Sequence, residues 1–60
     1  MKNTIDKIQE ALSYYNFKSL EIKKYINSNT SLTVDEIIEK AGELSALEYK
    51  ITALEAAEGN

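Results

Sequence analysis

The sequence predicts an all-α protein, an antiparallel two-helix hairpin that pairs with a second copy into a four-helix bundle. Three observations carry this prediction: two apolar stripes with helical spacing, one short polar loop between them, and a chain too small to enclose both stripes alone. The 60 residues make one domain at most. We expect helices over about 4–27 and 33–58, joined by a loop at 28–32.

The first helix follows from apolar residues that recur every three, four or seven positions, which is the period of one helix face. They are Ile5, Ile8, Leu12, Tyr15, Ile22 and Ile26, with Ser19 filling the gap. Thr4 or Asn3 is expected to cap the start of this helix, where Asp6 suits the positive helix end. Asn16 is the weakest point, and a break there would leave two shorter helices.

The second helix has the clearest start signal in the chain. Thr33 and Glu36 match a capping box, and Leu32 with Ile37 matches a hydrophobic staple. Glu36 also precedes Lys40 by four residues, a spacing that favours an ion pair. The short polar side chains of the preceding loop favour a turn because they hydrogen-bond to their own backbone.

The second helix is expected to end near Ala57 or Glu58, because Gly59-Asn60 favours a helix stop. Gly42 costs about 1 kcal/mol relative to Ala in a helix interior. Its missing side chain would let another helix approach closely. The expected inward residues are Val34, Ile37, Ala41, Leu44, Leu47, Ile51 and Leu54.

Self-association is predicted because each helix of a lone hairpin has only one neighbour. Small scaffolds in this position use disulfides, metals or oligomerisation, and the chain contains neither Cys nor His. A homodimer is the expected state, since twofold dimers are the commonest oligomers.

An apolar row outside the main stripe is the predicted protein interface. Tyr14, Phe17 and Leu20 recur every three residues and point away from the inward stripe at 100° per residue. The alternative is a wide core face, or a kink at Asn16 that turns the row inward. The expected polar rim of the row is Lys18, Glu21 and Lys24.

Composition argues against an enzyme. Glu36, Glu39 and Glu43 lie along one helix face, yet helical di-metal sites add a Glu-x-x-His pair that this chain lacks. Ser19 and Ser45 have no His to activate them. We expect no catalytic residue, cofactor or metal. The three glutamates are a solvated acidic face or, as the alternative, an acidic contact for a partner.

Direct nucleic-acid binding and membrane binding are not expected either. The formal net charge is -3, and phosphate affinity requires many neutralising cations. Only Lys18, Lys23 and Lys24 cluster, and they lie on different helix faces. No run reaches the length of a membrane-spanning segment, and no signal peptide is expected.

The second helix resembles that of the small sporulation aspartyl-phosphate phosphatases, which are also short helical hairpins. Their Ser-Gln-Glu-Leu-Asp-like run falls here on Ala41-Gly42-Glu43-Leu44-Ser45. Ala41 replaces the Ser, and Ser45 replaces the Asp on which the activity depends. The resemblance therefore implies a shared architecture, and no catalytic residue is transferred.

The sequence as a whole predicts a cytoplasmic, non-enzymatic protein that binds and modulates another protein. The favoured partner is a transcription regulator or another DNA-binding protein, because an acidic surface suits a basic partner. The Lys-rich, Arg-free composition suits a bacterial or bacteriophage origin. The alternatives are a structural or assembly protein whose apolar face serves only self-association, and a direct nucleic-acid binder.

Overall fold

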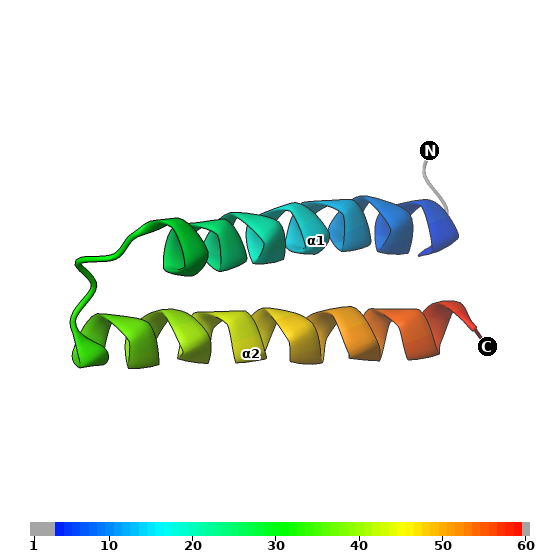
Figure 1. The fold of residues 1–60 in the computed structure, drawn as a ribbon. Helices are drawn as coiled ribbons and strands as arrows, with labels where there is room; N and C mark the ends of the chain where they lie inside the picture. The colour runs from blue at the N-terminus through cyan, green and yellow to red at the C-terminus, as the bar shows by residue number, and fades with distance from the viewer. Residues whose placement is uncertain (1–3, 60) are drawn as a thin grey trace.

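The computed structural model of the protein describes residues 4–59 as two antiparallel helices lying side by side. Helix α1 spans Thr4–Ser28 and helix α2 spans Val34–Glu58 (Figure 1). The hairpin measures 45 × 16 × 14 Å. The predicted all-α hairpin is thus confirmed for one chain, with α1 ending one residue later than expected. Helix α1 runs through Asn16 without interruption, so the alternative of two shorter helices is wrong.

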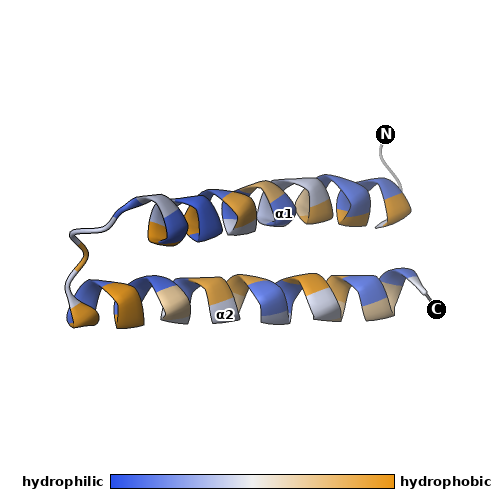
Figure 2. Ribbon diagram, in the orientation of Figure 1, coloured by the Kyte–Doolittle hydropathy of each residue, from blue (hydrophilic) through white to orange (hydrophobic). Residues whose placement is uncertain are grey.

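The core is one narrow seam between the helices. On α1, Ile8, Leu12 and Ser19 are buried. The half-buried residues that complete the seam are Tyr15, Ile22 and Ile26 on α1, and Lys40, Leu44, Leu47, Ile51 and Leu54 on α2. These positions recur every three or four residues, as one face of a helix does. Apolar segments recur along both helices (Figure 2), but no α2 residue is fully buried.

The loop end of the α2 stripe differs from the prediction. Val34, Ile37 and Ala41 are exposed, and Lys40 takes the seam position expected for Ala41. Ile5, at the start of the predicted α1 stripe, is exposed as well. A lysine can occupy such a position because its aliphatic stem covers apolar surface while the ammonium group reaches water. Lys40 pairs with Glu43 at 3.2 Å, whereas Glu36 is engaged by Thr33. The expected pair of Lys40 with Glu36 is therefore replaced.

Side-chain hydrogen bonds fix the connection between the helices. The Thr33–Glu36 capping box is present, as predicted. The Asn29 side-chain oxygen accepts from the backbone N–H of Ser31 at 3.1 Å and from its hydroxyl at 3.0 Å. The Ser28 hydroxyl donates to the Lys24 carbonyl at 2.5 Å. Asn29 and Ser31 thus hydrogen-bond within the loop, as its short polar side chains predicted.

The other end of the hairpin is also tied together. The Gln9 side-chain amide donates to the Glu58 carboxylate, which joins the first turns of α1 to the last turn of α2. The Gly59 N–H donates to the Glu55 carbonyl at 3.0 Å, so α2 ends where predicted. The proposed cap at Asn3 lies outside the described residues.

Candidate protein-interaction surface

The outer face of α1 carries the predicted apolar row in exposed form. Tyr14, Phe17 and Leu20 are 58%, 56% and 64% exposed. Phe17 is exposed because it lies on the far side of α1, about 200° around the helix from Ser19, which is buried against α2. The alternative that the row turns into the core is therefore wrong for this hairpin. That this row binds a partner protein remains a prediction.

Part of this row borders a shallow depression. Phe17 and Leu20 form its apolar side, while Glu21 and Lys24 give it a charged edge. The full lining is Phe17, Leu20, Glu21, Lys23, Lys24 and Asn27. The structure thus brings together four of the six predicted interface residues at one place.

Tyr14 and Lys18, the other two, lie elsewhere. The Tyr14 ring meets the Tyr15 ring edge-on, with centroids 5.5 Å apart and an interplanar angle of 67°. This contact fixes Tyr14 against its neighbour. Lys18 lines a groove between the helices instead, and its ammonium group lies 3.4 Å from the Glu21 carboxylate. Lys18 is therefore not an edge of the depression.

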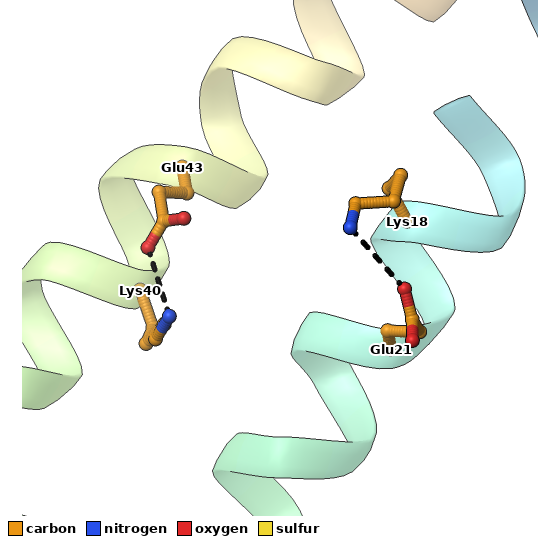
Figure 3. Close-up of polar contacts among 4 residues, drawn as sticks. All are labelled: Lys18, Glu21, Lys40 and Glu43. Carbon is orange, nitrogen blue, oxygen red and sulfur yellow. Dashed lines mark ion pairs between the residues drawn. The ribbon is translucent and has the colours of Figure 1, made fainter. Parts of the chain in front are cut away.

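One broad face of the hairpin carries two Lys–Glu ion pairs beside a groove, and we call it the charged face. Ion pairs Lys18–Glu21 and Lys40–Glu43 line a single groove between α1 and α2 (Figure 3). The Lys40 ammonium also lies 5.3 Å from the centre of the Tyr25 ring. The hydrogen bond to Glu43 and its negative charge raise the pKa of Lys40. The groove is lined by Lys18, Glu21, Ile22, Tyr25, Lys40 and Glu43.

The glutamates of the predicted acidic row make different contacts within the hairpin. Glu36, Glu39 and Glu43 are all exposed. Glu36 is held by Thr33, however, whose backbone and side-chain hydrogen bonds lower the pKa of the Glu36 carboxyl. Glu43 is paired with Lys40. Two of the three carboxylates thus serve the hairpin itself, which weakens the row as a contact for a partner.

The opposite broad face has a groove that we call the serine groove. Ser19 is only 5% exposed, and its hydroxyl has no hydrogen-bond partner in the described hairpin. In the sequence Ser19 fills a gap in the apolar stripe of α1, and no local signal marks the groove, because half of its lining lies on α2. Its lining is Asn16, Ser19, Lys23, Glu48, Ile51 and Thr52.

Neither metal-site geometry nor similarity to known proteins adds to this description. Within residues 4–59, no group of three or more Asp or Glu side chains is placed to hold a metal ion. Neither α1 nor α2 is apolar over a length that could cross a membrane. No family model, curated protein or solved structure matches the chain. Functional inference therefore depends on the surfaces described above.

Proposed function

We propose that this protein is a non-enzymatic, homodimeric binding module that modulates another protein through the outer face of α1. The favoured partner is a transcription regulator or another DNA-binding protein in the cytoplasm. The observation that carries the proposal is the row of Tyr14, Phe17 and Leu20, each more than half exposed.

The composition of the row suits a protein interface. Aromatic side chains offer large contact areas and are enriched at interface centres. Phe17 and Leu20 lie beside a depression that Glu21 and Lys24 border. An apolar centre with a polar rim is the usual anatomy of such a contact.

Charge supports a basic partner. The net charge of -3 opposes direct binding to a phosphate backbone. The same charge attracts a positively charged protein and speeds its approach. DNA-binding regulators carry such basic surfaces, which is why we favour this partner class.

Homodimer formation is supported by how little apolar surface one hairpin buries. Ile8 and Leu12 are its buried apolar residues in the described chain. Nine large apolar residues of the same region stay exposed: Ile5, Tyr14, Phe17, Leu20, Tyr25, Val34, Ile37, Ile38 and Tyr49. A second hairpin packed broadside on the first would form a four-helix bundle and shield part of this surface.

A second candidate is a structural protein that uses its apolar surface only to assemble. Exposed apolar residues on α2 favour it, since Tyr49 is 76% and Val34 is 71% exposed. In that case Phe17 lies between copies of the chain. Replacing it would then reduce the oligomer mass.

The test compares Phe17→Gln with Tyr49→Gln, two replacements of exposed aromatic residues that add no charge. Immobilised protein is exposed to extract of the source cells, and captured proteins are identified and rebound in purified form. We expect a DNA-binding protein whose affinity falls at least about tenfold with Phe17→Gln and is retained with Tyr49→Gln. Equal binding by both variants would refute the role of the row. A lower oligomer mass of Phe17→Gln would favour the structural protein instead.

A further inference from the structure

We draw no further inference here: the strongest candidate, the outer face of α2 on which Ile38 and Tyr49 are exposed beside the small residues Gly42 and Ser45, is an unpartnered face, and nothing in the structure shows what covers it.

Discussion

Thr33 and Glu36 each hydrogen-bond to the other's backbone N–H. The Thr33 hydroxyl oxygen accepts from Glu36 at 3.1 Å, and the Glu36 carboxylate accepts from Thr33 at 3.0 Å. The Ile37 N–H also donates to the Thr33 carbonyl at 3.0 Å. These bonds satisfy N–H groups that the first turn of a helix leaves without partners. They fix the residue at which the loop ends and α2 begins.

The capping box predicts a pH-dependent contribution of Glu36 to stability. Hydrogen bonds from Thr33 lower the pKa of Glu36 below its ordinary value of 4.5. A carboxyl group with a lower pKa in the folded state stabilises the fold above its unfolded pKa. That contribution is lost as the pH falls through the folded pKa. Glu36→Gln should therefore lower the melting temperature at pH 7 and have a smaller effect near pH 3. A constant difference across this range would contradict the charged cap.

A second prediction contrasts a core residue with a surface residue. Leu12 is buried in the seam, so Leu12→Ala should cost about 2–5 kcal/mol, which is most of the stability of a domain this small. Phe17→Ala should cost less than about 1 kcal/mol in the isolated protein, because Phe17 is largely exposed. Thermal melts followed by circular dichroism measure both. An equally large loss for Phe17→Ala would show that the row is packed in the protein's own fold.

The fold was predictable from sequence where the signals are local. The capping box and the polar loop act within a few residues of the chain, and both are observed. The seam of α2 was predicted less well near the loop. Whether Lys40 or Ala41 faces α1 depends on the alignment of the two helices, which local spacing does not determine. The aliphatic stem of a lysine then fits where a pattern of apolar residues favours alanine.

The candidate surfaces were predictable to a similar degree. The exposure of Tyr14, Phe17 and Leu20 follows from helix geometry alone. The depression beside Phe17 and the placement of Lys18 depend on side-chain positions that spacing does not provide. The serine groove needs α2 in place beside α1, so a single stripe of residues could not reveal it.

Gly42 gives a prediction about helix stability. A Cβ atom added there meets nothing within 4 Å, so α1 is not the helix that approaches Gly42 closely. Gly42→Ala should therefore stabilise the hairpin by about 0.5–1 kcal/mol, the difference in helix propensity. Chemical denaturation measures this gain. Gly59→Ala is the control, since Gly59 lies at the end of α2 and should change stability little. Destabilisation by Gly42→Ala would indicate that another chain packs against Gly42.

Ser19→Ala should stabilise the hairpin. In the single hairpin the substitution removes a buried hydroxyl that has no partner. This change should stabilise the monomer by about 0.5–1 kcal/mol, since Ala also has the higher helix propensity.

Thermal melts of wild type and Ser19→Ala, followed by circular dichroism, measure this gain. Ser19→Ala should melt at a higher temperature than wild type, because it removes a polar group that the fold buries without a partner. A lower melting temperature of Ser19→Ala would mean that the hydroxyl is hydrogen-bonded in the folded protein.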